Sequence, residues 1–487
     1  MNTLKHDFQK RSQWYTNRSS CIFPLDIKKG SDFCLSFLNY WKLKNNITNI
    51  ILNMRFYDQE GNLKKIHTKT IIENHNEIYV SSIIGKNFKG IVDIEFISTQ
   101  NLRFPFPGIT GFYISPNKII SGVHSAGRVL STDEISNKNQ FTDETNFSLK
   151  YKIKKKIYPF FSLFNYFYKK KNPVLVKIYD LKKKIVSKKI VKGPIKPYEN
   201  KIIFLNNIFS HGQLRKAKFC TVRLNNIGIF PRMICGNYHK NLHHYEVTHS
   251  FPYQKNKSDF ISNKFYNNKV ANMTYLPYVK PKLINLTLRV FPTNIGKTYN
   301  AKHYVFNKAK RSFENKGVYL LKPSKEFFEY NLNSPDEEFG YFGIKQKNVP
   351  SRINTSFIYS NQNINNLSSD IALGFKSIEY PNKYTSWGSF INTNSSDTIF
   401  LIRKISHYKK KKSSIGTMTF FGKKFSKQIK ISLINDDYKI IYFNKAVRRK
   451  IKDNSGISWI LNCSNGEGIE VFWITYNKEF VSGCHSF

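Results

Sequence analysis

Short runs in which apolar and polar residues alternate recur along the whole chain. In one of them, Leu52, Met54 and Phe56 alternate with the more polar neighbours Asn53 and Arg55. Runs with this period of two are typical of strands that bury one face. Clusters of Gly, Pro, Asn and Asp separate the runs about every ten residues and favour turns. Because no stretch has the caps and period of an amphipathic helix, we expect an all-β protein.

The chain also repeats itself four times. The clearest copies are strand-like segments in which His124, His249, Leu373 and His485 occupy the same place, at steps of 125, 124 and 112 residues. A period of this length is one small folded unit. Two hydrophobic strands precede each copy; the first lies at 34–41, 160–167, 273–279 and 398–405, and the second at 49–58, 173–180, 284–292 and 414–422.

The repeat predicts four tandem antiparallel β-sandwich units of about 120 residues, each large enough for its own core. The expected boundaries are 1–142, 143–262, 263–390 and 391–487. If the units pack together, they would form a compact, pseudo-symmetric monomer.

The composition adds a strong positive charge. The chain has 78 Lys and Arg against 32 Asp and Glu, a net charge of +46. An AT-rich genome would account for many of the lysines but not for the scarcity of acids. The charge predicts an anionic partner, namely an acidic glycan, a membrane surface or an acidic protein. Nucleic acid is less favoured, because zinc-finger, RRM and KH patterns are absent and few aromatic residues lie beside lysine clusters.

The lysines gather between the first two landmark strands of each unit, at 42–46, 168–172, 279–282 and 407–412. If the units share a fold, these loops occupy one corner of each unit and form a basic rim, with Lys169, Lys170, Lys410 and Lys411 as binding residues. Alternatively, they are ordinary solvated loops.

A His–Ser pair ends three of the four copies, and it has two interpretations. Either the pairs line a polar pocket at one end of each sandwich, or each His is a buried residue that hydrogen-bonds a neighbouring strand. Leu373 in the third copy supports the second interpretation. The pairs are His124 and Ser125, His249 and Ser250, and His485 and Ser486.

The second copy carries further polar residues, which suggest a metal or catalytic site. On a strand, His244 and Glu246 point to one side and His249 to the other. His239, His244 and Glu246 are therefore candidate ligands of a divalent metal in the second unit. They also suggest the alternative function, an enzyme of surface-polysaccharide or sugar metabolism whose site combines them with His249 and Arg232. P-loop, GxSxG and HExxH signatures are absent.

An arginine precedes the final strand in three copies, as Arg103, Arg232 and Arg352. Each could hold a carboxylate or phosphate with paired hydrogen bonds. Each could equally stabilise its unit by bonding backbone carbonyls.

The N-terminus has no run of signal-peptide length and no long apolar segment follows, so we expect a cytoplasmic protein that could lie against the inner membrane surface. The six cysteines form no CxxC pair, which predicts buried, reduced thiols.

The unit length and the strands that end in Asn39 and Asn165 resemble the sensory rhodopsin transducer family. Single-domain members of that family assemble as tetramers and resemble carbohydrate-binding sandwiches. The resemblance covers the architecture of residues 20 to 487 and implies a binding role, with four units fused in one chain. The leading hypothesis is therefore a non-catalytic recognition or scaffold protein that binds an anionic partner through basic loops.

Overall fold

The computed structural model consists mainly of β-strands, with 65% strand and 9% helix, which confirms the all-β prediction. It describes residues 16–485 except 104–105, 125–143, 166–172, 224–231, 253–272, 283, 293–297, 308, 311, 323–324, 333–337, 346–351, 362–366, 378–383, 405–412, 435–437, 448–454 and 465–468.

The strands fall into four successive groups. The first contains β1 (Arg18–Ile27), β2 (Asp32–Leu38), β3 (Ile51–Asp58), β4 (Leu63–Thr70), β5 (His75–Tyr79), β6 (Phe88–Ile97), β7 (Thr110–Ile114) and β8 (Ile120–His124). The second contains β9 (Glu144–Ser148), β10 (Ile157–Phe164), β11 (Pro173–Tyr179), β12 (Ile185–Lys192), β13 (Asn200–Phe204), β14 (Phe219–Arg223), β15 (Ile234–His239), β16 (His244–His249) and the short β17 (Phe251–Pro252).

The third group contains β18 (Met273–Val279), β19 (Ile284–Val290), β20 (Tyr299–Asn307), β21 (Ser312–Leu321), β22 (Phe328–Leu332), β23 (Phe339–Lys345), β24 (Arg352–Asn361) and β25 (Ser368–Ser377). The fourth contains β26 (Tyr384–Asn392), β27 (Asp397–Lys404), β28 (Ser414–Gly422), β29 (Phe425–Leu433), β30 (Tyr438–Tyr442), β31 (Ser455–Cys463), β32 (Ile469–Tyr476) and β33 (Val481–His485).

The helices of the described residues are short. They are α2 (Tyr40–Asn45), α3 (Ser81–Ile84), α5 (His211–Lys216) and α6 (Phe443–Val447), with single 3₁₀ turns at Ile153–Lys155, Leu205–Asn207 and Lys240–Leu242.

All four groups have the same topology. In each, the first, sixth, third and fourth strands form one antiparallel blade in that order, and the fifth, second, seventh and eighth form the next. The second group adds β17 to one blade, and in the third β18 pairs with β25, so that its two blades make one continuous sheet. The shared order confirms the fourfold repeat, although the predicted landmark strands of the third copy, now β18 and β19, are one strand too early. The hydrophobic patterns of β18 and β19 are alike enough to allow that shift.

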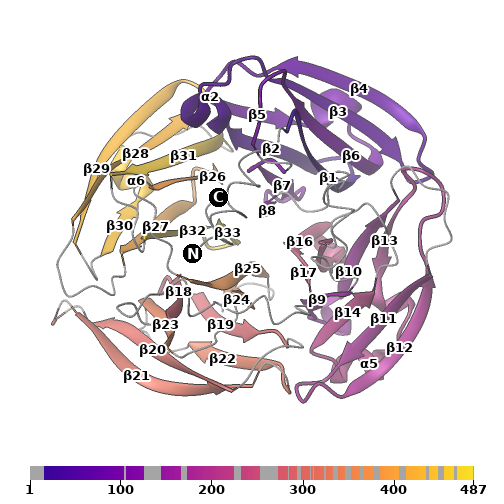
Figure 1. Ribbon diagram of the computed structural model, residues 1–487. Coiled ribbons are helices and arrows are strands. Elements are labelled where there is room, and N and C mark those ends of the chain that lie inside the picture. The colour runs from indigo at the N-terminus through magenta and orange to yellow at the C-terminus, as the bar shows by residue number, and fades with distance from the viewer. Residues whose placement is uncertain are drawn as a thin grey trace, which may run out of the picture.

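The prediction of four tandem sandwiches is wrong, because the sheets form one eight-bladed β-propeller (Figure 1). Sheet faces that a separate sandwich would expose are covered by the blade of the next unit. Stacked rings mark these contacts, with centroids 3.9 Å apart for Tyr57 and Tyr198 and 4.4 Å apart for Tyr40 and Trp387. The expected boundary at 390/391 also falls inside β26, a strand of the last group. Burial between units, which a repeat pattern does not reveal, therefore determines the architecture.

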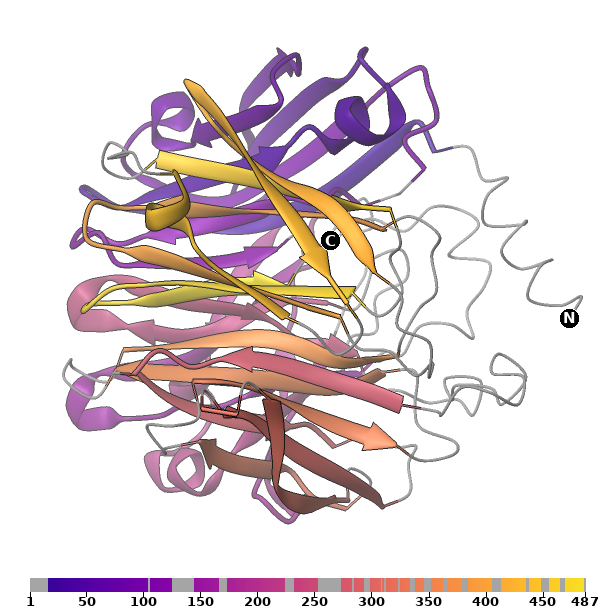
Figure 2. The same ribbon diagram turned by 90° about the vertical axis from the view of Figure 1, so that its left-hand side faces the viewer.

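The eighth strands β8, β16, β25 and β33 line the centre of the ring, and each contacts the next in a closed cycle. Figure 1 places them around the axis, and Figure 2 shows the blades from the side, with strands that run roughly along that axis. The fourth strands β4, β12, β21 and β29 lie at the outer ends of their blades (Figure 1). Each unit therefore contributes an equivalent strand to the axis and another to the circumference.

The local patterns fit these positions. Leu52, Met54 and Phe56 on β3 are buried, as their alternation predicts, whereas β4 is exposed along almost its whole length. The five cysteines whose side chains are described are free and buried, which confirms the prediction for them. Within the described part of the chain, no helix is both long and apolar enough to cross a membrane.

Candidate functional site

Equivalent histidines of different units meet near the axis. His124 and His249 end β8 and β16, and their rings are 4.4 Å apart, centroid to centroid, in an edge-to-face arrangement. Both side chains are buried. The prediction of a separate pocket in each unit is wrong for these two residues, because they share one location. We call His124 and His249 the axial histidines.

The residues beside the axial histidines are only partly described. Ser250 is buried, and its hydroxyl accepts a 2.9 Å hydrogen bond from the backbone N–H of Met233. His485 ends β33, and its side chain lies outside the described residues, as do Ser125 and Ser486. Leu373 occupies the equivalent place on β25.

The second polar group lies on the opposite side of β16, as the alternation predicts. Glu246 accepts hydrogen bonds from His239 Nε2 at 3.0 Å and from Asn237 Nδ2 at 3.2 Å, and Lys150 Nζ lies 3.8 Å from its carboxylate. The ring of His244 lies 5.6 Å from that of His239. We call these five residues the Glu246 cluster.

The electrostatics of the Glu246 cluster reflect its burial. Loss of solvent, reinforced by neighbouring His239, lowers the pKa of His244 to about 3. Burial also lowers the pKa of Lys150, although Glu246 opposes that shift. Nearby, burial raises the pKa of Asp370 to about 6 while Arg289 opposes it, and the Asp370 carboxylate accepts a hydrogen bond from Ser148 on β9. The cluster therefore continues into a polar contact between the second and third units.

The Glu246 cluster is held together by hydrogen bonds to a buried carboxylate. No group of three or more His, Cys, Asp or Glu among the described side chains is placed to hold a metal. The predicted ligand set of His239, His244 and Glu246 therefore does not assemble there, because Glu246 is instead hydrogen-bonded by His239 and Asn237. These side chains are also at most 5% exposed, which is not the open pocket that the alternative enzyme hypothesis needs.

A small cavity lies at the contact of the first and second units. It measures about 10 Å³, the space of one water-sized sphere, and Asp26, Tyr113 and Tyr245 are among its lining residues. Tyr245 donates a 2.5 Å hydrogen bond to Asp26, and Tyr113 bonds the carbonyl of Pro24 at 2.8 Å. The cavity is a packing gap between units rather than a ligand site.

The three recurrent arginines occupy different local positions in their units. Arg103 is exposed, and its backbone N–H donates to Asn101 at 2.9 Å. Arg232 is half-buried just before β15, at the same end of the hairpin as His249, since Ile234 pairs with His249. Arg352 begins β24, and its side chain lies outside the described residues.

The predicted basic loops are only partly described, because Lys169, Lys170, Lys410 and Lys411 lie outside the described residues. In the first unit the expected loop is helix α2, and Lys44 lies over the ring of Trp387, 5.0 Å from its centroid. In the third unit Lys280 is buried. Lys44 itself and Lys282 are exposed, so the described lysines of these loops differ in burial.

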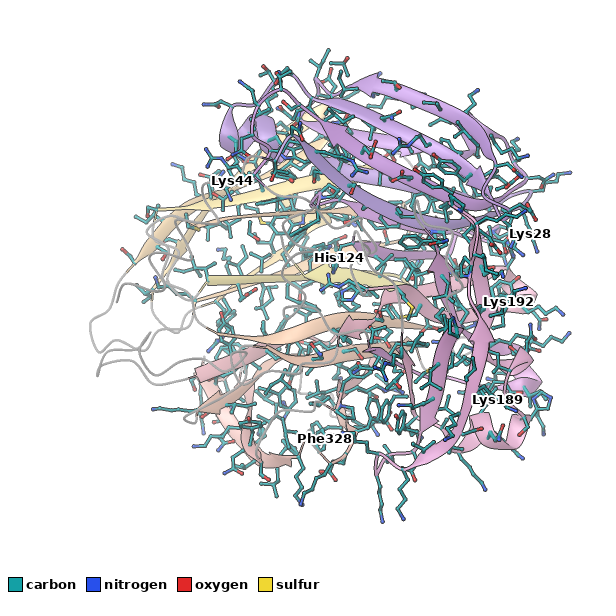
Figure 3. The ribbon with its side chains drawn as sticks, turned by 45° about the vertical axis from the view of Figure 1, so that its right-hand side comes forward. Lys28, Lys44, His124, Lys189, Lys192 and Phe328 are labelled. Atoms are coloured by element: carbon teal, nitrogen blue, oxygen red, sulfur yellow. The ribbon has the colours of Figure 1, made fainter. Side chains whose placement is uncertain are left out.

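Further exposed lysines lie on the outer strands, and the sequence analysis did not single these strands out. β4, β12, β21 and β29 together carry nine lysines and one glutamate. Figure 3 shows Lys189 and Lys192 pointing away from the molecule on β12, and His124 deep inside the ring. Short runs that mix Lys with Ile and have no consistently apolar face, such as Ile185–Lys192, could have indicated such exposed strands. We call these four strands the lysine edge.

No protein-family model matches the chain, and no curated protein matches its sequence. The functional argument therefore depends on the geometry of the chain itself.

Proposed function

We propose that the protein is a non-catalytic binding body that holds a linear acidic polysaccharide against its lysine edge. The observation that supports this is that the outermost strand of an equivalent blade carries lysine in all four units. A row of ammonium groups without matching acids attracts a polyanion and raises its local concentration.

The charge on the lysine edge is largely uncompensated. Among the described residues, ion pairs of these lysines involve Lys64 with Asp58 at 2.8 Å and Lys316 with Glu314 at 3.8 Å. The three lysines of β12 lie on an exposed strand, beside Ile190, which is 74% exposed. Lysine stems and aliphatic side chains together give a surface that can contact both the charged groups and the less polar faces of sugar rings.

The arrangement of the four lysine-edge strands favours a linear polyanion over a membrane as the binding partner. The four strands lie around the circumference of the ring (Figure 1), so that a flat bilayer would meet only part of them at once. A flexible polyanion could pass from one strand to the next and gain affinity with each contact.

The kind of exposed side chain favours a glycan over nucleic acid. The large exposed apolar residues of β4 and β12 are Leu63, Ile66, Ile185 and Ile190, all aliphatic. Binding of single-stranded nucleic acid uses aromatic rings on which bases stack.

Lysine on an edge strand also has a purely structural use, because it prevents strand pairing with another molecule. A matched pair of triple variants separates the two roles. One replaces Lys188, Lys189 and Lys192 with glutamine; the other replaces Lys154, Lys155 and Lys156, three exposed lysines outside the lysine edge. Both remove the same charge.

We expect the β12 variant to bind a labelled sulfated or uronate oligosaccharide about tenfold more weakly, since each lost exposed ion pair removes up to about 1 kcal/mol. The control variant should bind like the wild type in the same fluorescence titration. Equal weakening in both variants would mean that only net charge matters and would overturn the assignment to the edge. Stronger binding to single-stranded DNA or to phosphatidylserine vesicles would overturn the choice of polysaccharide.

A further inference from the structure

A flat aromatic surface lies on the second unit, where the turn between β9 and β10 meets helix α5. The Tyr151 hydroxyl is hydrogen-bonded to His211 Nδ1. The two ring planes are inclined by only 15°, and their centroids are 5.7 Å apart. Because the hydroxyl oxygen lies in the plane of its own ring and Nδ1 in the plane of the other, the two rings lie edge to edge in almost one plane. We call Tyr151 and His211 the aromatic platform.

The aromatic platform reaches the solvent. Tyr151 is half-buried and His211 is exposed. Tyr158, which follows the turn, is also half-buried, and its ring lies 6.3 Å from that of Tyr151 at an angle of 39°. The hydrogen bond between Tyr151 and His211 fastens α5 to the turn, which is a structural role. Ring faces at the surface also suit planar ligands that stack.

Positive charge surrounds the aromatic platform. The turn carries three exposed lysines at 154–156. Helix α5 adds Arg215 and Lys216, which are both exposed. Exposed Lys240 lies beside the turn, because its backbone N–H donates a 3.1 Å hydrogen bond to the carbonyl of Lys156. The platform is therefore bordered by cations from three separate segments.

The charge acts directly on the rings. Burial raises the pKa of Tyr151, neighbouring Tyr158 adds to the rise, and the positive charge of Arg215 opposes it. The segments 150–158 and 205–218, which form the turn and α5 with its approach, contain no Asp or Glu. A ligand on the platform would therefore meet cations and no carboxylates from these two segments.

The geometry points to a binding surface for single-stranded nucleic acid at the aromatic platform. Proteins that bind single strands without sequence preference combine aromatic rings, on which bases stack, with cations that contact the phosphates. A planar base covers two coplanar rings more completely than the puckered sugar ring of a glycan does. The sequence patterns of zinc-finger, RRM and KH domains are absent from this chain, but a surface of this kind requires none of them.

This inference is independent of polysaccharide binding, because it uses no lysine of the lysine edge. The two surfaces are neighbours, since Gln213 on α5 donates a 3.1 Å hydrogen bond to Ser187 on β12 and α5 lies beside β12 in Figure 1. Variants must therefore separate them. The platform variant combines Tyr151→Leu with His211→Leu, which removes both flat rings and keeps apolar side chains.

The test is fluorescence anisotropy of a labelled oligothymidylate of about 15 nucleotides, titrated with the full chain at several salt concentrations. We expect the platform variant to bind about tenfold more weakly, because base stacking is lost. A charge variant, Arg215→Gln with Lys240→Gln, should lower the slope of log K against log salt by about 1.4, since each lost phosphate contact removes about 0.7. Lys86→Gln with Lys89→Gln, two exposed lysines of the first unit, is the matched control and should bind like the wild type.

Inorganic polyphosphate serves as a second probe, because it carries charge but no bases. It should bind the wild type and the platform variant equally. Because Arg215 and Lys240 are exposed, the charge variant tests the surface without disturbing the fold.

Absence of oligonucleotide binding in the wild type would overturn the inference, as would binding that the platform and charge variants leave unchanged. Greater weakening by replacement of Lys188, Lys189 and Lys192 than by the platform variant would place the nucleic acid on the lysine edge. That result would contradict both this inference and the choice of polysaccharide. Failure of the polysaccharide to bind would leave the oligonucleotide result unaffected, so that the two proposals fail separately.

Discussion

Replacing Arg403 with alanine is expected to lower the free energy of unfolding by about 4 kcal/mol, measured by urea titration. Arg403 on β27 is buried, and its guanidinium carbon lies 3.9 Å from the ring centroid of Phe313 and 4.2 Å from that of Tyr341. Both rings belong to the third unit. The substitution removes two cation–π contacts and leaves a cavity at the contact between the third and fourth units.

Arg403→Met is the matched control, because methionine keeps much of the side-chain volume and removes only the charge. Replacing a buried charge with an apolar side chain of similar size is often nearly neutral, so we expect a loss of about 1 to 2 kcal/mol. A loss below about 1 kcal/mol for Arg403→Ala would contradict the account, since it would mean that the two units pack equally well without this side chain.

Acid should destabilise the protein through His244. The pKa of this histidine is about 3 in the folded chain, because it is buried and near His239, and 6.5 is its ordinary value. Between these two pKa values, His244 is therefore protonated in the unfolded chain and neutral in the folded chain. The corresponding stability is fully present above pH 6.5 and is lost as the pH falls toward 3. At pH 4.5 the loss is about 3 kcal/mol.

His244→Phe should remove this dependence, so that the variant is about 3 kcal/mol more stable than the wild type at pH 4.5 and similar at pH 7.5. The measurement is urea unfolding at both pH values. Thr248→Val, on the same side of β16 and also buried, serves as the control and should change stability equally at the two. If His244→Phe gave no greater difference at pH 4.5 than at pH 7.5, the burial of a neutral His244 would be disproved.

Local patterns in the sequence were sufficient to predict the strands and the repeat. Leu52, Met54 and Phe56 are buried on one face of β3, and His124, Leu373 and His485 lie on equivalent strands. The ring itself was not predictable in this way. Contacts such as that of Arg403 with Phe313 join residues 90 positions apart in different units, and a repeat pattern carries no information on how its copies pack.

The candidate sites also combine features that local sequence patterns predict with features that depend on packing between units. The alternation along β16 correctly placed Glu246 and His249 on opposite sides, because that depends only on the strand period. It could not reveal that His249 meets His124, which follows from packing between units. The lysine edge was missed because the lysine-rich connections between the first two landmark strands, such as 407–412, indicated a basic rim made of loops. On β12 the lysines are mixed with isoleucine and valine, and only the topology identifies this strand as outermost.

Lysine acetylation with and without bound polysaccharide, read residue by residue by mass spectrometry, tests the central claim most directly. Binding along the lysine edge predicts that the polysaccharide protects the lysines of β4 and β12, including Lys65, Lys189 and Lys192, while Lys154 and Lys155 react as in the free protein. Protection at Lys154 and Lys155 with unchanged reaction on the outer strands would contradict it.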